Sequence, residues 1–466
     1  MNQTANAITT EMLLQMLNEH RYAEFRHELG ELLPIDAAEL LAELPQERLP
    51  VVFRLLKKDM GAAIFAEFEP EQQTAIINGL TDREISSMLG ELYTDDVVDM
   101  LEEMPANIVS RVLKSATPDV RSEINRFLAY PDNSAGSVMT SEFIELRKNM
   151  TCEEAVNRIR KIGLDSETVY VAYVTDSARV LQGVVPLKQL LFTPSDSIIG
   201  DIMNENVIFA YTHDDREDAV NTISRYDILA LPIVDTEKRL VGILTVDDAL
   251  DVLEDEATAD IEMMAAILPT DKTYMRTGVW ETFKKRIPWL LLLMITATFT
   301  GTIITHYETA IGTYAILTAF FPMLMGTGGN AGGQSSVAII RALSLGEIEM
   351  RDALRVFWKE LRVAIICGLT LSAATFVKVM AIDFGFRITE ISGTGIEQNN
   401  LLLALIISVT VFFAVLVAKA VGALLPIGAK RIGLDPAVMA SPFITTVVDT
   451  LTLVIYFAIA SSLLHF

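Results

Sequence analysis

Cysteine and histidine are scarce in this sequence. Cys152 and Cys367 are its two cysteines and lie far apart, so neither a disulfide framework nor a thiolate metal site is available. Its five histidines are scattered, at positions 20, 27, 213, 306 and 465, so a metal that prefers nitrogen or sulfur ligands fits poorly. The first 25 residues contain no basic region followed by an apolar run, so we expect no secretory signal there.

Basic residues are also scarce in the first 280 positions. This part has 50 Asp and Glu against 24 Lys and Arg, a net charge of −26, whereas the rest has 11 against 13, a net charge of +2. An acidic surface of this kind repels nucleic-acid phosphates and favours a cation as its partner. The composition therefore excludes nucleic-acid binding and divides the chain into an acidic front part and a nearly neutral rear part.

Charged residues are nearly absent from long runs in the rear part. These runs cover positions 288–305, 309–340, 363–382, 398–418 and 436–466. Because a helix of about 20 apolar residues crosses the hydrocarbon of a bilayer, we expect five membrane spans. Ten of the basic residues near the runs fall in alternate segments and two in the others, which predicts a cytosolic N-terminus. With five spans, the C-terminus is expected outside the cytosol.

The front part begins with a helical pattern. Residues 11–130 alternate leucine-rich segments with proline-containing breaks, and Ala42-Glu43-Leu44 recurs as Ala66-Glu67-Phe68 and Gly90-Glu91-Leu92 at a spacing of 24. Stacked helical hairpins explain this repeat, and a plain helical bundle with chance similarity is the alternative. Both interpretations predict an all-α domain over residues 1–132.

The next residues are richer in β-branched side chains and repeat internally. Ser137-Val138-Met139 matches Asp201-Ile202-Met203, and Leu181-Gln182-Gly183-Val184 matches Leu240-Val241-Gly242-Ile243. Two copies of such a strand-helix-strand-strand-helix unit resemble a tandem pair of cystathionine-β-synthase (CBS) domains. We expect these domains to cover residues 133–198 and 199–255. The resemblance implies a regulatory sensor of adenosyl nucleotides.

The nucleotide motif of such domains is complete in one copy only. The resemblance implies a glycine followed at fixed spacing by a hydroxyl residue for phosphate and an aspartate for ribose. The second copy has Gly242, Thr245 and Asp248 at these positions, whereas the first copy has Pro186 and Gln189 in place of the hydroxyl and the carboxylate. Thr245 and Asp248 are therefore the candidate ligands of ATP, but loss of nucleotide binding is the favoured interpretation.

An acidic helical segment, expected over residues 247–282, connects this pair to the first span. Asp247, Asp251 and Asp255 lie four residues apart on one helical face, where like charges destabilise a helix. A solvated acidic face is the ordinary explanation, but the position beside the membrane favours a bound cation. Carboxylates without basic partners suit hard divalent cations, and Mg²⁺ in particular.

Two polar features interrupt the apolar runs. The second run contains a glycine-rich segment over residues 326–336 that includes Asn330, and the last run contains Asp449. Ser441, Thr445 and Asp449 recur every four residues and share one helical stripe. A carboxylate near the middle of a bilayer indicates an ion pathway. The alternatives are a glycine packing face for the segment and a protonated structural role for the aspartate.

The order of these parts resembles the MgtE family of magnesium channels. The segments GTGGNAGGQS and GLDPAVMASPFITTVVD carry most of the specificity. The resemblance implies an α-helical membrane protein with five transmembrane helices over residues 283–466, a cytosolic all-α N-terminal superhelical domain and α/β tandem CBS domains. It also implies a homodimer in the cell inner membrane, with a pore lined by the second and fifth spans.

The resemblance assigns two kinds of metal site. In the pore, Asp449 holds a largely hydrated Mg²⁺, with Asn330, Thr445 and Ser441 nearby. Regulatory Mg²⁺ ions, which close the pore when cytosolic Mg²⁺ is high, would bind acids of the cytosolic entrance, the N-terminal domain, the CBS pair and the connecting helix. These acids are Asp435, Asp95, Asp99, Glu217, Asp227, Asp248, Asp251, Glu256 and Asp260. Ala259 stands where relatives can have an acid.

Other functions remain compatible with the sequence. A channel or carrier for Mn²⁺ or Co²⁺ is the nearest alternative, and a membrane-anchored nucleotide sensor without transport is the next. An anchor explains neither Asp449 nor the glycine segment. An enzyme is the least favoured class, because no Ser-His-Asp set, P-loop or His-rich metal triad has usable spacing. Lys419, embedded in the fourth span, either extends to the cytosolic surface or weakens the access of cations.

Overall fold

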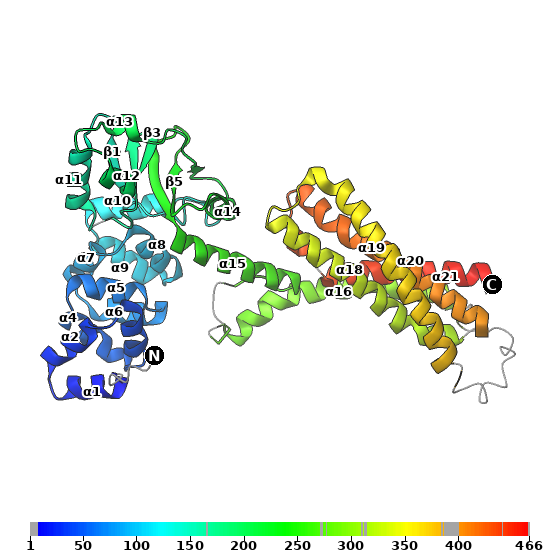
Figure 1. The fold of residues 1–466 in the computed structure, drawn as a ribbon. Helices are drawn as coiled ribbons and strands as arrows, with labels where there is room; N and C mark the ends of the chain where they lie inside the picture. The colour runs from blue at the N-terminus through cyan, green and yellow to red at the C-terminus, as the bar shows by residue number, and fades with distance from the viewer. Residues whose placement is uncertain are drawn as a thin grey trace, which may run out of the picture. The chain divides into compact units, whose positions relative to one another are not determined.

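The computed structural model describes residues 8–164, 166–270, 274–275, 277–308, 311, 315–383, 385, 400–439 and 441–464. The chain divides into two units, Met1–Leu253 and Glu254–Phe466. Figure 1 shows their elements in chain order, coloured from blue to red. The division falls inside the helix that follows the second CBS domain, close to the change in composition that the charge counts predict.

Short helices build the first part of unit 1 (Figure 1). Their bounds are α1 Thr10–Asn18, α2 Tyr22–Gly30, α3 Pro34–Ala42, η1 Gln46–Arg48, α4 Leu49–Leu55, α5 Lys58–Ala66, α6 Pro70–Gly79, α7 Asp82–Leu89, α8 Thr94–Glu103, α9 Ala106–Ser115 and α10 Pro118–Phe127. Proline begins α3, α6 and α10, where its missing N–H costs no hydrogen bond. Alternate helices pack together, α3 on α5, α5 on α7 and α7 on α9, with α4, α6 and α8 as a second row.

This packing explains the 24-residue repeat. Helices α3, α5 and α7 end at Ala42, Ala66 and Leu89, so the three repeated triplets mark the ends of equivalent helices in successive hairpins. Each hairpin buries its apolar side chains against the next, and one core cluster runs through the stack from Leu13 to Ile124. Stacked hairpins are therefore the correct interpretation, rather than a plain bundle.

Two α/β modules follow, each with a three-stranded sheet. Their elements are β1 Ile144–Arg147, α11 Cys152–Ile162, β2 Val171–Thr175, β3 Leu181–Pro186, α12 Leu187–Phe192, α13 Ile199–Ile202, β4 Ala210–Tyr211, α14 Arg216–Tyr226, β5 Ala230–Val234, β6 Leu240–Thr245 and α15 Val246–Met264. In each sheet the first strand pairs parallel with the second and the second pairs antiparallel with the third. The predicted strand-helix-strand-strand-helix unit and its repetition are confirmed.

Helices α8 and α10 of the N-terminal helical stack share a hydrophobic core with the second α/β module. Val98 of α8 and Phe127 of α10 lie in the same buried cluster as Met139, Leu231 and Ile233. Apolar contact of this kind removes surface from water and holds the two parts of unit 1 together. Acidic residues of α8 are thereby placed next to the α/β modules.

Helix α15 is shorter than the acidic helix expected over residues 247–282. It ends at Met264, and Ala266 adopts the left-handed conformation with φ 57°. The N–H of Ile267 donates to the carbonyl of Glu262 at 2.9 Å, which closes the helix end, and Pro269 follows. The next helix begins at Val279, so the expected segment contains most of α15, residues 265–270, which are not helical, and the start of α16.

Unit 2 consists mainly of long apolar helices. They are α16 Val279–His306, η2 Ala315–Phe320, α18 Phe321–Ser344, η3 Met350–Asp352, α19 Ala353–Lys378, η4 Val379–Asp383, α20 Asn400–Arg431, η5 Pro436–Met439 and α21 Ser441–Leu464. Among the described residues, four stretches are long and apolar enough to cross a membrane: Val279–His306, Met350–Asp383, Asn400–Arg431 and Pro436–Leu464. Helix α18, with 24 residues, is a fifth long helix that its glycines make less hydrophobic.

Helices α18, α20 and α21 pack against one another, α19 packs against α20, and α16 packs against α21 (Figure 1). None of the described side chains of α16 is buried, which suits a helix surrounded by lipid. The spans differ from the predicted runs at their ends: α16 begins nine residues before Pro288, which lies inside it, and α20 continues past Ala418 to Arg431. The length of a charge-free run underestimates the length of a helix whose charged residues are paired or lie at the membrane surface.

Candidate functional site

Asp449 of α21 faces the glycine segment of α18. A Cβ atom added at Gly329 would lie 3.5 Å from Oδ1 of Asp449 and 2.8 Å from Cγ2 of Thr445. Within the described residues, Oδ1 of Asp449 is buried and has no hydrogen-bond partner. The predicted carboxylate and the predicted glycine segment are therefore neighbours, and the carboxylate oxygen between them is left without a donor.

The glycines allow close approach of three helices. A Cβ at Gly332 would lie 3.0 Å from Ile444 of α21 and 3.1 Å from the carbonyl oxygen of Ala418 in α20. A Cβ at Gly422 of α20 would lie 2.3 Å from the carbonyl oxygen of Gly332. Helix α18 continues without a break from Phe321 to Ser344, so the segment is a packing face of a regular helix and does not interrupt it.

The other predicted pore residues differ in how far they are exposed. Thr445 lies one turn before Asp449 on α21 and is partly buried, whereas Asn330 is exposed on the surface of the chain. Ser441 begins α21, and its side chain lies outside the described part of the structure. One chain therefore presents one carboxylate and one exposed amide at this level of the helices.

Lys419 is buried rather than extended to the cytosolic surface. Its side chain is 7% exposed, and its ammonium donates to the hydroxyl oxygen of Ser335 at 3.0 Å and lies 3.7 Å from a carboxylate oxygen of Glu360. The hydroxyl of Ser335 in turn donates to Glu360 at 2.6 Å. Three helices, α18, α19 and α20, each contribute one member of this network, so the predicted extension of Lys419 to the cytosolic surface is wrong, whereas its effect on the access of cations stays a prediction.

Within unit 2, the C-terminal part of α15 contacts the end of α18. The hydroxyl of Ser344 donates to Asp260 at 3.0 Å, and Met263 and Met264 pack against the cluster formed by Ile340 and Ala437. Burial raises the pKa of Asp260, and the Ser344 hydrogen bond partly opposes this effect.

Two more acids act on Asp260. The charges of Asp435 and Glu256 raise its pKa further. Asp435 is exposed, and its carboxylate accepts from the N–H of Ala437 at 2.7 Å. Three of the predicted regulatory acids therefore influence one another at this helix end.

A second group of acids lies between α8 and the α/β modules of unit 1. Burial, followed by the negative charge of Asp248, raises the pKa of Asp95 to about 9, that of Asp96 to about 6 and that of Glu167 to about 7. The charged groups with the largest effect on Asp95 are all carboxylates. Within the described part of the chain, Oδ1 of Asp95 and Oε2 of Glu167 are buried without hydrogen-bond partners. This acid group has the electrostatics of a cation site, because a cation would supply the missing partner.

Hydrogen bonds from uncharged donors hold Glu142, a neighbour of these acids, in position. The hydroxyls of Thr94 and Thr140 each donate to the carboxylate of Glu142 at 2.7 Å, and the N–H of Glu167 donates to the carbonyl of Glu142 at 2.8 Å. These bonds join the start of α8 to the start of the first α/β module. Asp96, Glu142 and Glu167 are not among the predicted residues. Glu142 and Glu167 are far from Asp95 in the sequence, and Asp96, although adjacent to Asp95, is not part of the matched set.

The remaining predicted acids do not join a common metal position in this structure. They are Asp227 and Asp251, which are exposed, and Glu217, which is partly buried. Asp99 of α8 instead belongs with the acids around Asp95, since burial and the charges of Glu102, Asp96 and Asp248 raise its pKa to about 7. Across the described residues, no three His, Cys, Asp or Glu side chains converge in an arrangement that could hold a metal ion. The acid groups around Asp95 and Asp260 therefore have the charge that attracts a cation without the converged geometry of a bound one.

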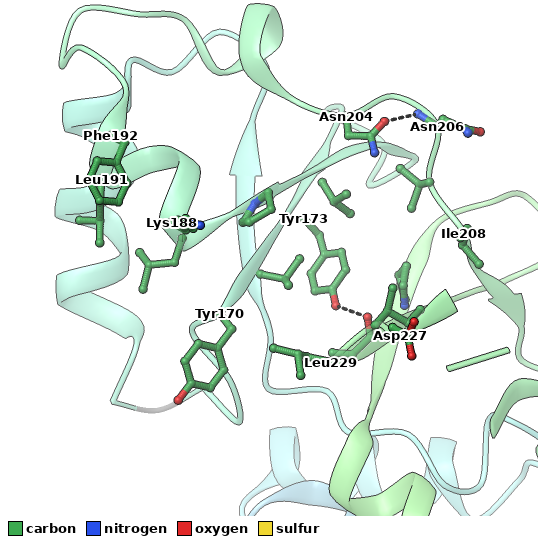
Figure 2. A pocket seen from close by; sticks show the side chains of 18 residues that line it. Tyr170, Tyr173, Lys188, Leu191, Phe192, Asn204, Asn206, Ile208, Asp227 and Leu229 are labelled. Carbon is green, nitrogen blue, oxygen red and sulfur yellow. Dashed lines mark hydrogen bonds between the residues drawn. The ribbon is translucent and has the colours of Figure 1, made fainter. Parts of the chain in front are cut away.

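A cavity of about 630 Å³ opens in the CBS pair (Figure 2). Tyr170 and Lys188 line it from the first module and Asp227 and Leu229 from the second. The hydroxyl of Tyr173 donates across the cavity wall to the carbonyl of Ala230 at 3.3 Å, which joins the two sheets. An aromatic ring and a cation beside an apolar wall are features of many sites for small organic anions.

The predicted nucleotide residues lie elsewhere. Thr245 and Asp248 do not line this cavity, and the hydroxyl of Thr245 donates to the carboxylate of Asp248 at 2.5 Å. Pro186, which replaces the hydroxyl residue of the first copy, does line it, whereas Gln189 donates to the carbonyl of Ile202. The two motif copies therefore face different surroundings, and Asp248 belongs with the acid group around Asp95.

The fold and these sites define a multi-pass membrane protein with a cytosolic N-terminal part. Known sequence families match in the same order. A family described as the MgtE intracellular N domain matches residues 32–133, a CBS domain matches residues 199–255, and a family described as divalent cation transporter, MgtE, matches residues 321–459.

Similar proteins cover the chain almost completely. The magnesium transporter MgtE of Thermus thermophilus is 35% identical over 97% of this chain and 98% of its own length. The magnesium transporter MgtE of Bacillus subtilis is 29% identical over 100% of this chain and 99% of its own length. A crystal structure of the soluble part of a magnesium transporter matches with a TM-score of 0.51 at 32% identity, covering 53% of this chain and 98% of that one. The chain belongs to the MgtE family, whose named members are transporters and not enzymes.

Proposed function

We propose that this chain forms a channel for Mg²⁺ in which Asp449 holds the hydrated ion. The observation that carries this proposal is Oδ1 of Asp449, which is buried and lacks a hydrogen-bond partner among the described residues, in a helix long enough to span a bilayer. A carboxylate at that depth needs water or a cation beside it. The relatives named as magnesium transporters support Mg²⁺ as the ion.

We propose a homodimer in the inner membrane, with the pore between the two copies and the C-terminus outside the cytosol. Two observations support the dimer. Asn330 is exposed on a long apolar helix, where an amide facing lipid is costly, and one chain offers one carboxylate near it. Mg²⁺ keeps several of its waters, so one carboxylate from each copy provides enough protein ligands.

Cytosolic Mg²⁺ is proposed to close this channel. Asp95, Asp96, Glu167 and Asp248 repel one another in unit 1, and Asp260 experiences the charges of Asp435 and Glu256 in unit 2. Bound Mg²⁺ would neutralise each group and stabilise the closed arrangement, whereas its loss would let the carboxylates repel one another. The other predicted acids, Asp99, Glu217, Asp227 and Asp251, are proposed to complete further regulatory sites. Inward flow needs no fuel, because moving a doubly charged ion through 100 mV releases about 4.6 kcal/mol.

We also propose a location for ATP. The cavity of Figure 2 offers the Tyr170 ring for stacking on a base and the Lys188 ammonium for a phosphate. Thr245 and Asp248 are less suitable, because each already satisfies the other. ATP binding that persists in Thr245→Val and is lost in Tyr170→Ala with Lys188→Gln would support this location, and the reverse would contradict it.

The channel is tested by Mg²⁺ influx into proteoliposomes that contain the purified full chain. Asp449→Asn keeps the size of the side chain and removes its charge, so we expect influx to fall at least tenfold. Asp352→Asn is the matched control, since Asp352 lies in η3 and pairs with Arg355 at the start of α19. Equal influx through the two variants would contradict the pore assignment.

The same assay addresses the rival ions. We expect Mn²⁺ and Co²⁺ to compete weakly with Mg²⁺, and preferential transport of either would assign the channel to that ion. Gating is tested separately by adding Mg²⁺ to the cytosolic side, where influx is expected to fall. Absence of any influx in folded, correctly inserted protein would favour a membrane-anchored sensor.

A further inference from the structure

A cavity in the N-terminal helical layer gathers the basic residues of an acidic region. It has a volume of about 680 Å³ and is lined by residues of α4, α5 and α7 and of the segments between them. Its basic lining residues are Arg54, Lys57, Lys58 and Arg83. Positions 49–110 contain no other Lys or Arg, and of the 12 Asp and Glu in this fully described stretch only Glu84 lines the cavity.

The charge of Glu84 is already balanced. Its carboxylate accepts from Nε of Arg54 at 2.9 Å and from the N–H of Thr81 at 2.7 Å. These bonds, the Arg54 bond most of all, lower the pKa of Glu84 to about 2. Arg54 and Glu84 therefore cancel, and the cavity keeps the three positive charges of Lys57, Lys58 and Arg83. In the described part of the chain, these three side chains form no ion pair.

The backbone and the apolar lining add to these charges. Helix α5 begins at Lys58, and its N-terminal cap Lys57 is extended and makes no side-chain cap bond, so the free N–H groups and positive end of the helix dipole lie beside the cavity. Phe53 and Leu80 also line it, as do Leu56 and Met88. The cavity thus combines a cationic side with an apolar side.

We propose that this cavity binds a small phosphate-bearing anion, with Lys57, Lys58 and Arg83 contacting the phosphate and the apolar side contacting the organic part. The volume is in the range of sites for small organic ligands. Arg83 offers paired N–H donors that match phosphate oxygens, and the two lysines supply further positive charge. The site is independent of the proposed channel. It allows an otherwise acidic domain to bind a negatively charged ligand.

Inorganic pyrophosphate is the probe that tests this site. The full chain is placed in nanodiscs of zwitterionic lipid with EDTA, because Mg²⁺ would sequester pyrophosphate, and binding is measured by calorimetry at low salt. We expect one site per chain whose Kd rises at least tenfold in Lys57→Gln with Lys58→Gln and Arg83→Gln. The matched control is Arg26→Gln with Arg48→Gln and Lys114→Gln, three exposed basic residues of the same domain that do not line the cavity.

Two further measurements make the result specific. Unchanged thermal unfolding midpoints show that the variants fold. Nanodiscs with phosphatidylglycerol distinguish a lipid headgroup from a free phosphate compound, because a bound headgroup would compete with pyrophosphate. Absence of pyrophosphate binding by the unmodified chain, or equal binding by the two triple variants, would overturn the proposal whether or not the chain conducts Mg²⁺.

Discussion

The ammonium of Lys419 lies 3.7 Å from a carboxylate oxygen of Glu360, and both side chains are buried between long apolar helices. Ser335 completes this pair by donating to Glu360 and accepting from Lys419. Because Ser335 lies in the glycine segment of α18, the pair joins the helix that faces Asp449 to α19 and α20. A charge inside a span is thus explained by a partner on another helix.

Removing one member of this pair is expected to be costly. Lys419→Met leaves Glu360 as an unpaired buried carboxylate, which is expected to destabilise the protein by about 3 kcal/mol. The thermal unfolding midpoint in detergent and the Mg²⁺ influx should both fall. Lys419→Met with Glu360→Met removes both charges and should recover most of the midpoint, which separates an ion pair from a general loss of packing. A double variant as unstable as the sum of the single variants would contradict the pairing.

Two glycines allow α18 and α20 to approach each other closely. A Cβ at Gly422 would lie 2.3 Å from the carbonyl oxygen of Gly332, and backbone atoms on both sides leave little room for adjustment. Gly422→Ala is therefore expected to separate α18 from α20 and to cost about 2 kcal/mol. Gly428→Ala on the same helix is the matched control, because no atom lies within 4 Å of its added Cβ. Thermal unfolding midpoints of the two variants check this prediction, and equal midpoints would contradict it.

The elements of this fold could be predicted from the sequence where a local pattern repeats. The triplets at a spacing of 24 mark equivalent helix ends, and the matching segments around Gly183 and Gly242 mark two copies of one α/β unit. The end of α15 was harder to predict, because it depends on the left-handed conformation of Ala266, which the residue type does not favour. The boundaries of the domains at 132, 198, 255 and 282 stay predictions.

The candidate sites could be predicted only in part. Asp449 and the glycine segment stand out because polar groups are rare in apolar runs, and the structure places them side by side. Glu167 and Glu360 could not be found in this way, since each lies in a segment where carboxylates are ordinary. Their importance arises from tertiary contacts, with Asp95 in one case and Lys419 in the other.

The acid group around Asp95 predicts a dependence on pH. The pKa values of Asp96, Glu167 and Asp95 are raised to about 6, 7 and 9, so the folded protein binds more protons than the unfolded chain at pH values between about 4 and 9. The stability of the metal-free protein should therefore decrease as the pH rises from 6 to 8. Thermal unfolding midpoints in EDTA measure this change, and Asp95→Asn, which cannot ionise, should reduce it.

The stabilisation of the protein by Mg²⁺ should increase with pH in the same experiment. A cation bound by these carboxylates replaces their protons, so it competes less with protons at higher pH. The increase in unfolding midpoint on adding millimolar Mg²⁺ should be larger at pH 8 than at pH 6. An increase that is independent of pH, or that Asp95→Asn leaves unchanged, would place the bound ion elsewhere.

The contact of Ser344 with Asp260 provides a test of the proposed regulation of the channel by α15. Asp260→Asn retains an oxygen that accepts the Ser344 hydrogen bond, but it removes one of the charges that act together with Asp435 and Glu256. We expect Mg²⁺ to bind more weakly at this end of α18. The cytosolic Mg²⁺ concentration that half-inhibits influx should therefore rise about fivefold, a change typical of coupling between two sites. Ser344→Ala is the matched control, because it removes the hydrogen bond and keeps the charge, so its half-inhibition should change less. If Ser344→Ala has the larger effect, the hydrogen bond rather than the cation holds α15 in place.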